Sequence, residues 1–345
     1  MPKTPSEGGQ ADTRPEINYP LVEDTRPAIY RAMKYWGKKP HNIWAQYIDR
    51  YTPSGGVVAD PFAGSAIAAF EAVKLGRKAI AFDLNPLTAF IIEVTASASQ
   101  FDEESFHAAA QQIRESAEAT EVYQQNYVRI RDGQIGTVLN YRWEDGRVIG
   151  VAFQRDDESR LLVEADSRDQ RLAQEMARLE IRDWHPTRKF PDHPSITHRF
   201  LIAAGGGTID FLWTRRNLWL LAYLFKHIRV VKNEGVRLQL LSAFVQALHL
   251  CSKMVIPRHE EAERNFSGSW GRPDYMIRRR QMEQNPIDVF WRSCTARQGI
   301  LPMMSDAAET FPDGIDIHDA RAAGRLRHSA DINYARLTSR TLVIT

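Results

Sequence analysis

The sequence has few cysteines and no long apolar run. Cys251 and Cys294 are the only cysteines among 345 residues, too few for a disulfide framework or a zinc site of four thiolates, so both are expected to be reduced thiols. No run of about 18 apolar residues is present, so we expect no membrane span. Residues 1–25 are polar and lack the apolar core of a signal peptide. We therefore expect a cytoplasmic protein with a disordered leader over residues 1–25.

The sequence also lacks a large excess of either positive or negative charge. The 45 Lys and Arg residues nearly balance the 43 Asp and Glu residues, which gives a formal net charge of +2. Any nucleic-acid surface must therefore be local. Basic clusters occur at residues 34–39, 215–216 and 278–280. Most such clusters are solvated faces, but nearby rings such as Trp36 and Trp213 favour contacts with bases and phosphates.

Several catalytic motifs are missing. The ten histidines show no HExxH pair or comparable spacing, so no metal site is expected. No GxSxG sequence is present, which argues against a serine hydrolase of that type. The glycines at residues 205–207 lack the Lys and Ser or Thr of a phosphate loop, so we interpret them as a flexible entry to a helix.

An alternation of short apolar runs and helical patterns occupies the first third of the chain. Residues 41–51 have helical spacing, and residues 57–59 form a short apolar run typical of a buried parallel strand. A helix is predicted over residues 66–75, ended by a glycine, and a second buried strand over residues 78–82. Two strands joined by a helix form a right-handed βαβ unit, so the pattern predicts a doubly wound parallel α/β sheet. A further amphipathic helix is predicted over residues 102–120.

Residues 122–200 change in character and predict a small antiparallel insertion. Two Asp-Gly pairs, at residues 132–133 and 145–146, are hairpin signals because they accept the positive φ of tight turns. Short strands are predicted around these turns, followed by a helix at residues 169–179. The predicted strands are 128–135, 138–143, 148–153 and 161–165.

Residues 201–345 are expected to return to the main domain, which begins at residues 26–121. Helices are predicted at residues 209–231 and 235–250, and an exposed loop at residues 265–280. The last five residues, 341–345, have the apolar pattern of a buried strand.

Acidic residues stand at the ends of the two predicted parallel strands. Residues 60–65, with the sequence DPFAGS, follow the first strand, where Asp60 can bind an ammonium or hydroxyl group and Gly64 permits close approach to a ligand. Asp83 lies 23 positions after Asp60, close to the spacing of the acid that binds a ribose in dinucleotide folds. A single glycine beside an acid favours a ligand with an ammonium and a ribose over a diphosphate. The alternative is that Asp60 only caps the turn and Asn85 only begins the next helix.

Four segments together resemble DNA methyltransferases that modify the amino group of adenine or cytosine. DPFAGS at residues 60–65 is similar to their cofactor loop, and FDLNP at residues 82–86 to their second-strand motif. KYWGKKP at residues 34–40 is similar to the segment that completes the cofactor pocket. FLWTRRNL at residues 211–218 is similar to a segment of large adenine-specific DNA methylases, many of which carry a zinc ribbon whose cysteines this chain lacks.

This resemblance implies a doubly wound Rossmann-like fold that depends on S-adenosylmethionine, with a β-rich insertion. It also implies DNA as a partner, with residues 122–200 as a candidate target-recognition region, and a context of restriction–modification or phage defence. The residues that match the family's cofactor pocket are Lys39, Asp60, Pro61, Phe62, Gly64, Ser65, Asp83 and Asn85.

The chain departs from the family pattern at two places. Ala66 replaces a second glycine; because alanine is compatible with a helix start, we expect at most a modest loss of cofactor affinity. The family's catalytic tetrapeptide, Asp/Asn/Ser-Pro-Pro-Tyr/Phe, is absent, and no Pro-Pro pair occurs in the sequence. Residues 342–345 are similar to the strand that leads into that tetrapeptide, so the catalytic motif is expected after Thr345. We therefore expect a truncated or split enzyme, weakly active or inactive alone, that a second chain could complete.

Two other classes of function remain open. One is a non-catalytic subunit that binds the cofactor or DNA within a restriction or defence complex; a neighbouring reading frame beginning with Asp-Pro-Pro-Tyr would argue against it. The other is a Rossmann methyltransferase that acts on RNA or a small molecule, which methyl transfer to such a substrate and none to duplex DNA would support.

Overall fold

The chain forms two compact units in a computed structural model. The described residues are 16–32, 35, 37–131, 133–190, 207–257, 268–270, 277–319 and 340–344. Unit 1 comprises residues 1–27, 37–96 and 313–345, and unit 2 comprises residues 28–36 and 97–312. Several residues singled out in the sequence lie outside the described part: Lys34, Trp36, Asp132, Gly205, Gly206 and Thr345.

Unit 1 is built on a βαβ arrangement, as the sequence predicts. Strands β1 (Val57–Asp60) and β2 (Lys78–Asp83) pair in parallel, with Val57 opposite Lys78. Helix α3 (Ile67–Lys74) connects them and buries most of its side chains. Gly76, with a φ of 72°, follows this helix in the left-handed conformation that a helix end favours. Helix α4 (Pro86–Ala96) comes next and contacts β2.

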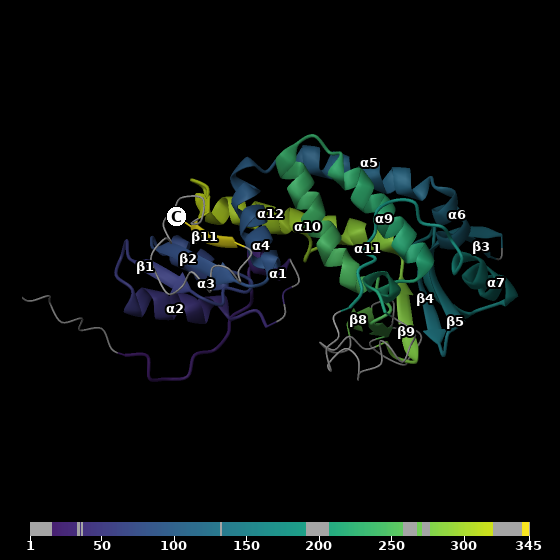
Figure 1. Ribbon diagram of the computed structural model, residues 1–345, viewed down its shortest axis with the longest axis horizontal. Helices are drawn as coiled ribbons and strands as arrows, with labels where there is room; N and C mark the ends of the chain where they lie inside the picture. Colours follow the sequence, from purple (N-terminus) through teal and green to yellow (C-terminus); the bar gives the residue numbers. More distant parts are fainter. Residues whose placement is uncertain are drawn as a thin grey trace, which may run out of the picture. The chain divides into compact units, whose positions relative to one another are not determined.

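The rest of this sheet differs from the predicted doubly wound arrangement. Its strand order is β1-β2-β11-β10, and β11 (Arg340–Ile344) runs antiparallel to both β2 and β10 (Ile317–Asp319). Figure 1 shows β1, β2 and β11 side by side. The fold of unit 1 is therefore a mixed α/β sheet with one parallel pair among the described strands. An apolar run indicates a buried strand but carries no information about its direction, so the sequence could not reveal that β11 is antiparallel.

Part of the predicted leader is attached to helix α2 (His41–Tyr51). The backbone N–H of Asp24 donates to Asn42 Oδ1 at 3.3 Å, and Asn42 Nδ2 donates to the carbonyl of Val22 at 2.7 Å. The N–H of Ile17 also donates to the hydroxyl of Tyr51 at 3.3 Å. Residues 16–25 of the predicted leader therefore contact helix α2 through these hydrogen bonds, while residues 1–15 lie outside the described part.

Unit 2 combines a group of helices with an antiparallel sheet. Figure 1 shows α9, α10 and α11 beside the long helix α5, with the sheet at one end of this group. The helices of this unit are α1 (Ala28–Arg31), α5 (Glu103–Glu118), α6 (Glu121–Tyr127), α7 (Ser167–Met176), α9 (Arg215–Arg229), α10 (Glu234–Leu250), α11 (Pro286–Thr295) and α12 (Ile300–Thr310), with short 3-10 helices η1 (Ser97–Gln100) and η2 (Ile209–Leu212). No described helix is long and apolar enough to cross a membrane.

Polar side chains cap the starts of several of these helices. The predicted helix 209–231 is divided, because Trp213 and Thr214 have extended backbones and the Thr214 side chain accepts from the N–H of Asn217 to cap α9. Asn285 caps α11 in the same way, with Pro286 at the first helical position. Asp166 forms a capping box at the start of α7.

The antiparallel sheet agrees with the predicted hairpins and gains a strand. Its strands β3 to β6 follow one another in sequence, and Asp145 and Gly146 adopt the positive φ predicted for the turn between β4 and β5. A fifth strand begins at residue 280, the last residue of the predicted loop 265–280, and pairs with β4, while residues 268–270 of that predicted loop also form a strand. The bounds are β3 (Val128–Arg131), β4 (Gln134–Glu144), β5 (Arg147–Arg155), β6 (Arg160–Glu164) and β9 (Arg280–Gln284); β7 (Val255–Pro257) and β8 (Gly268–Trp270) form a separate pair.

The two units divide the chain at other places than the sequence predicted. The predicted insertion, residues 122–200, does not stand apart, since its sheet shares unit 2 with α5, α9, α10 and α11. The two helices expected in the main domain therefore belong to unit 2 instead. Helical periodicity identified them correctly, but periodicity does not say which unit a helix packs against.

Candidate cofactor-binding site

The predicted site residues meet at the carboxyl ends of the two parallel strands. Asp60 is the last residue of β1 and Asp83 the last residue of β2. Because β1 and β2 are parallel neighbours, both carboxylates lie at the same edge of the sheet, where ligands bind in open α/β sheets.

The loop after β1 makes a tight turn into α3. The N–H of Ala63 donates to the carbonyl of Phe82 at 2.8 Å, and the N–H of Ala66 donates to the carbonyl of Ala63 at 2.7 Å. Gly64 has a φ of 55°, which glycine adopts without strain. Ala66 caps α3 with a φ of 59° and is fully buried. Alanine here is therefore strained, a cost that its compatibility with a helix start did not predict.

Asp83 connects the loop after β1 to the turn after β2. Its Oδ2 accepts from the N–H of Gly64 at 2.7 Å, and its Oδ1 accepts from the N–H of Asn85 at 2.8 Å. The hydroxyl of Thr88 donates to the carbonyl of Gly64 at 2.6 Å. Gly64 is thus held through its N–H by Asp83, the last residue of β2, and through its C=O by Thr88, which follows β2.

Asn85 begins helix α4 as the alternative interpretation of the sequence proposed. Its Oδ1 accepts from the N–H of Leu87 at 3.0 Å, and Pro86 is the first helical residue. Asn85 is exposed, and its carbonyl accepts from the N–H of Thr88 at 3.1 Å. The geometry therefore gives Asn85 a capping role at the start of α4.

The carboxylate of Asp60 is partly buried and carries an electrostatic cost. Burial is the largest effect on the pKa of Asp60 and raises it, and the negative charge of Asp83 raises it further. The N–H of Phe62, which donates to Asp60 Oδ1 at 3.0 Å, and the positive charge of Lys39 lower the pKa. The net effect is a pKa above the ordinary value. The structure therefore brings Lys39, Asp60 and Asp83 within electrostatic range of one another, at a place where a cationic group would relieve the cost.

The other predicted site residues divide between the surface and the interior. Phe62 is 76% exposed and Pro61 is also exposed, whereas Ser65 is buried. An exposed ring beside a carboxylate can contact an apolar or aromatic part of a ligand, while Ser65 lies in the turn that leads into α3. Among the described residues, no group of three His, Cys, Asp or Glu side chains could hold a metal ion.

Sequence reasoning missed Thr88. It is buried, and its hydroxyl supports the cofactor loop from the first turn of α4. The Asn85-Pro86 pair is the signal that could have identified Thr88. A helix that begins at Pro86 places the side chain of residue 88, in its first turn, against the loop after β1.

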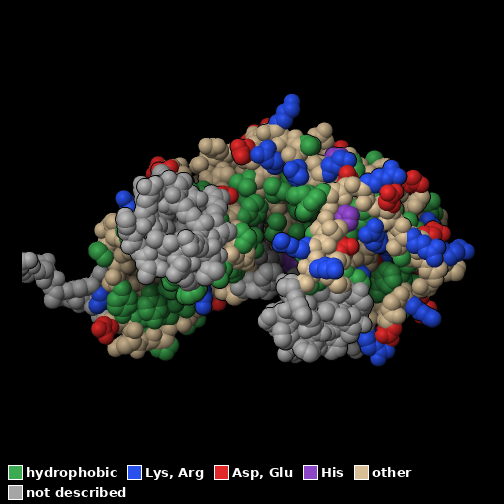
Figure 2. Space-filling view, in the orientation of Figure 1, with side chains coloured by type: hydrophobic (Ala, Val, Ile, Leu, Met, Phe, Trp, Pro, Cys, Tyr) green, Lys and Arg blue, Asp and Glu red, His purple; other side chains and the backbone are tan. Residues whose placement is uncertain are grey.

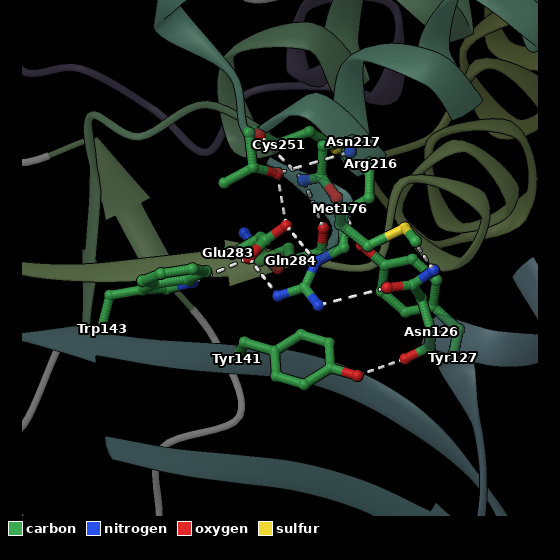
Figure 3. A network of polar contacts seen from close by, with 11 residues as sticks. Asn126, Tyr127, Tyr141, Trp143, Met176, Arg216, Asn217, Cys251, Glu283 and Gln284 are labelled. Carbon is green, nitrogen blue, oxygen red and sulfur yellow. Dashed lines mark hydrogen bonds and ion pairs between the residues drawn. The ribbon is translucent and has the colours of Figure 1, made fainter. Parts of the chain in front are cut away.

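The FLWTRRNL segment lies in unit 2, in a buried polar network that Figure 3 shows. Arg216 and Glu283 are fully buried and form a two-point ion pair, with N–O distances of 2.7 and 2.6 Å. The Arg216 guanidinium stacks on the ring of Tyr141 at 3.8 Å from its centroid. The indole N–H of Trp143 donates to Glu283 Oε2 at 2.7 Å, and the Thr214 hydroxyl donates to Oε1. This network joins α9 to strands β4 and β9.

Asn217 extends the network to two further backbone segments. Its Nδ2 donates to the carbonyls of Cys251 and Gln284 at 3.0 and 2.9 Å, and its Oδ1 accepts from the hydroxyl of Tyr127. The sequence resemblance of this segment therefore corresponds to a structural role in unit 2.

The basic clusters of unit 2 are largely neutralised. Arg279 pairs with Asp145 at 2.5 Å and Arg280 with Glu144 at 2.9 Å. On the face seen in Figure 2, the Lys and Arg side chains of unit 2 alternate with Asp and Glu side chains instead of forming one patch. The cluster at residues 278–280 is therefore mostly a solvated face.

One family comparison matches the part of the chain that carries the site. Residues 14–93 match the family model described as DNA methylase. No curated protein and no solved structure matches the chain. The matched range contains every predicted site residue, from Lys39 to Asn85, and begins before the segment that is attached to α2.

Proposed function

We propose that unit 1 binds S-adenosylmethionine and serves a DNA methyltransferase that modifies the amino group of adenine or cytosine. The observation that carries the proposal is the pair of carboxylates at the ends of β1 and β2, Asp60 and Asp83, within the range that is similar to DNA methylases. S-adenosylmethionine presents an ammonium, a ribose and a sulfonium that supplies the methyl group. A partly buried carboxylate with a raised pKa suits such a cation better than it suits a diphosphate.

Each residue of the loop has a role in this proposal. Asp60 accepts from the ammonium of the ligand, since a cation relieves the cost of its buried charge. Asp83 keeps lone pairs beyond the two that accept backbone N–H groups, because a carboxylate has about four acceptor sites, and these accept from the ribose hydroxyls. Phe62 packs on the ligand, and Lys39 stabilises the Asp60 carboxylate.

Target methylation needs residues from outside this sequence. The resemblance assigns the target amine to a tetrapeptide with a Pro-Pro pair, and these 345 residues contain none. We therefore propose that another polypeptide or a further segment supplies it. An amine conjugated to a ring is a poor nucleophile, and cofactor binding alone does not align it with the methyl group.

Calorimetric titration with three ligands tests the proposal. S-adenosylmethionine and S-adenosylhomocysteine should both bind with one saturable site, because both carry the ammonium and the ribose. Methylthioadenosine, which lacks the amino-acid part, should bind at least about tenfold more weakly, since it makes no charged hydrogen bond to Asp60. NAD should not compete. Equal binding of NAD, or no binding of S-adenosylmethionine by the folded chain, would reject the proposal.

A substitution in the same unit controls for nonspecific loss of charge. Asp49→Asn removes an exposed carboxylate of helix α2. This carboxylate pairs with Arg77, which directly precedes β2. It should leave the affinity for S-adenosylmethionine within about twofold, because a surface ion pair contributes little. An equal loss of affinity in Asp49→Asn and Asp60→Asn would mean that the effect is only one of overall charge.

A further inference from the structure

Unit 2 contains a cavity that the proposed cofactor site does not use. Its volume is about 500 Å³, which lies within the range of small-molecule sites. Its walls come from the end of β4, from α7, from the segment 208–216 and from residues near 253 and 277–281. Part of this wall belongs to the range 122–200, which the sequence predicts as a target-recognition region.

Three aromatic rings with fixed positions line the cavity: Trp143, Phe211 and Trp213. The indole N–H of Trp143 donates to Glu283 within the buried network, and the indole N–H of Trp213 donates to the carbonyl of Leu248 at 3.0 Å. Because their polar edges are bound to the protein, both indoles offer a ligand only their apolar surfaces. Such fixed rings are suited to stacking on a planar group.

Two side chains of opposite charge, Asp210 and Lys253, lie in the same wall. Asp210 Oδ1 is buried and has no hydrogen-bond partner among the described residues. The Lys253 ammonium lies 4.0 Å from the centroid of the Phe211 ring, and no described residue forms a hydrogen bond or ion pair with it. Burial lowers the pKa of Lys253, against the opposing effects of Glu283 and Asp210. An unsatisfied buried oxygen such as Asp210 Oδ1 is costly in a protein interior and therefore points to a ligand.

The buried network keeps the cavity in shape. Arg216 and Thr214 line it, and both bind Glu283, which also fixes Trp143. A site on such a framework is preorganised, so little ordering is required when a ligand binds. The Arg216 guanidinium is bound to Glu283, and the Arg215 guanidinium donates to the carbonyl of Leu179. Lys253 is therefore the lining cation whose side chain forms no hydrogen bond with a described residue.

We propose that this cavity binds one unstacked base of a DNA strand that carries an exocyclic amine, with the base between the aromatic rings, its amine on Asp210 and an acceptor atom on Lys253. The choice of DNA rests on the proposed function. The choice of base rests on the cavity, since a carboxylate accepts from N–H groups and repels carbonyl oxygens.

Cytosine and thymine distinguish this arrangement most sharply. The two rings have nearly the same size, but cytosine presents an amine at position 4 where thymine presents a carbonyl. Single-stranded oligodeoxycytidylate should therefore bind about tenfold more tightly than oligothymidylate of equal length, as measured by fluorescence anisotropy at one fixed salt concentration. An abasic strand of the same length should bind no better than oligothymidylate.

Variants of the cavity assign the effect to its residues. Asp210→Asn should remove the preference for cytosine, because an amide also donates to the carbonyl of thymine. Lys253→Gln should weaken binding of oligodeoxycytidylate about tenfold. Lys226→Gln is the matched control, because Lys226 lies in the same unit, is mostly exposed and pairs with Asp183 outside the cavity. It should change either affinity by less than about twofold.

A measurement on the unaltered chain avoids any folding defect of the variants. Replacement of cytosine by N4,N4-dimethylcytosine removes both N–H donors and should abolish the preference. The inference is overturned if the dimethylated strand binds as well as oligodeoxycytidylate, if the two natural strands bind equally, or if Lys226→Gln is as damaging as Lys253→Gln.

Titration with S-adenosylmethionine on the same samples separates this inference from the proposed function. Cofactor binding without a preference for cytosine rejects the cavity site alone. A cytosine preference that Asp210→Asn removes, without cofactor binding, rejects the proposed function and supports the cavity as a site for a nucleic-acid base.

Discussion

Conversion of each strand-end carboxylate to its amide should separate binding from stability in unit 1. Asp60→Asn and Asp83→Asn make the same change of shape and charge at neighbouring strand ends. Asp60 accepts a single backbone N–H through Oδ1, which an asparagine can also accept. Asp83 accepts two backbone N–H groups, one on each oxygen, and asparagine has only one acceptor oxygen.

The expected magnitudes follow from these contacts. Asp83→Asn leaves one N–H, of Gly64 or Asn85, facing an amide nitrogen, which should cost about 1–3 kcal/mol in the free energy of unfolding. Asp60→Asn should leave stability unchanged within about 0.5 kcal/mol or raise it, because it removes a charge that burial and Asp83 both disfavour. Its affinity for S-adenosylmethionine should fall about 10- to 150-fold, since a hydrogen bond to a charged group contributes about 1.5–3 kcal/mol.

The dependence on pH provides a second measurement of the same effect. The pKa of Asp60 is raised in the folded chain, so the folded state binds this proton more tightly and the charged form costs stability above that pKa. The cost disappears as the pH falls through the raised pKa, so the stabilities of Asp60→Asn and the unaltered chain should converge. Binding of the cation should weaken over the same range.

Thermal unfolding and calorimetry on both variants test this reasoning. A large loss of stability in Asp60→Asn with unchanged affinity would refute it and would make Asp60 a turn cap. Retention of full stability by Asp83→Asn would show that its two short contacts contribute little.

Further variants test other parts of the structure. Ala66→Gly should raise the free energy of unfolding of unit 1 by about 0.5–1 kcal/mol in denaturant unfolding. The strain of an alanine in the left-handed conformation costs more than the conformational entropy that glycine adds to the unfolded chain. Thr88→Val should cost about 1 kcal/mol and weaken cofactor binding severalfold in calorimetry, since the carbonyl of the cofactor loop loses its donor. Glu283→Gln should cost about 3–5 kcal/mol, because it leaves the charge of its arginine partner buried and unpaired. Burial alone would raise the pKa of Glu283, but its arginine partner and hydrogen bonds hold that pKa below the usual range. The ionised Glu283 therefore contributes its full stability above the ordinary pKa of glutamate, and this stability should be lost only as the pH falls through the lowered pKa. Acid unfolding measures this loss. Burial raises the pKa of both Cys251 and Cys294, so a thiol reagent should label them only at the rate of unfolding; rapid labelling would contradict their burial.

Local signals in the sequence predicted the parts of the fold whose partners lie close along the chain. The strand–loop–helix–strand pattern identified β1, α3 and β2, and the Asp145-Gly146 pair identified the turn between β4 and β5. These features depend on backbone conformation and periodicity within short windows, which residue types determine directly.

Features that depend on distant partners could not be predicted. The pairing of β11 with β2 joins segments from opposite ends of the chain, and the ion pair of Arg216 and Glu283 joins residues 67 positions apart. A single sequence shows that each segment is apolar or charged but not which other segment it meets. For the same reason, the cavity between Trp143, Asp210 and Lys253 had no signal in the sequence.

The division of the chain has a consequence for the order of folding during synthesis. Residues 97–312 of unit 2 occupy the whole interval between two segments of unit 1, residues 37–96 and 313–345. At about 5–20 residues per second, roughly 13 to 50 seconds pass between synthesis of β2 and synthesis of β11, the strand that pairs beside it. During that time the edge of β2 that β11 later covers is an unpaired strand edge on a nascent chain. A ribosome that stalls within unit 2 would therefore hold a folded or folding unit 2 together with an incomplete sheet, the state most exposed to chaperones and to aggregation.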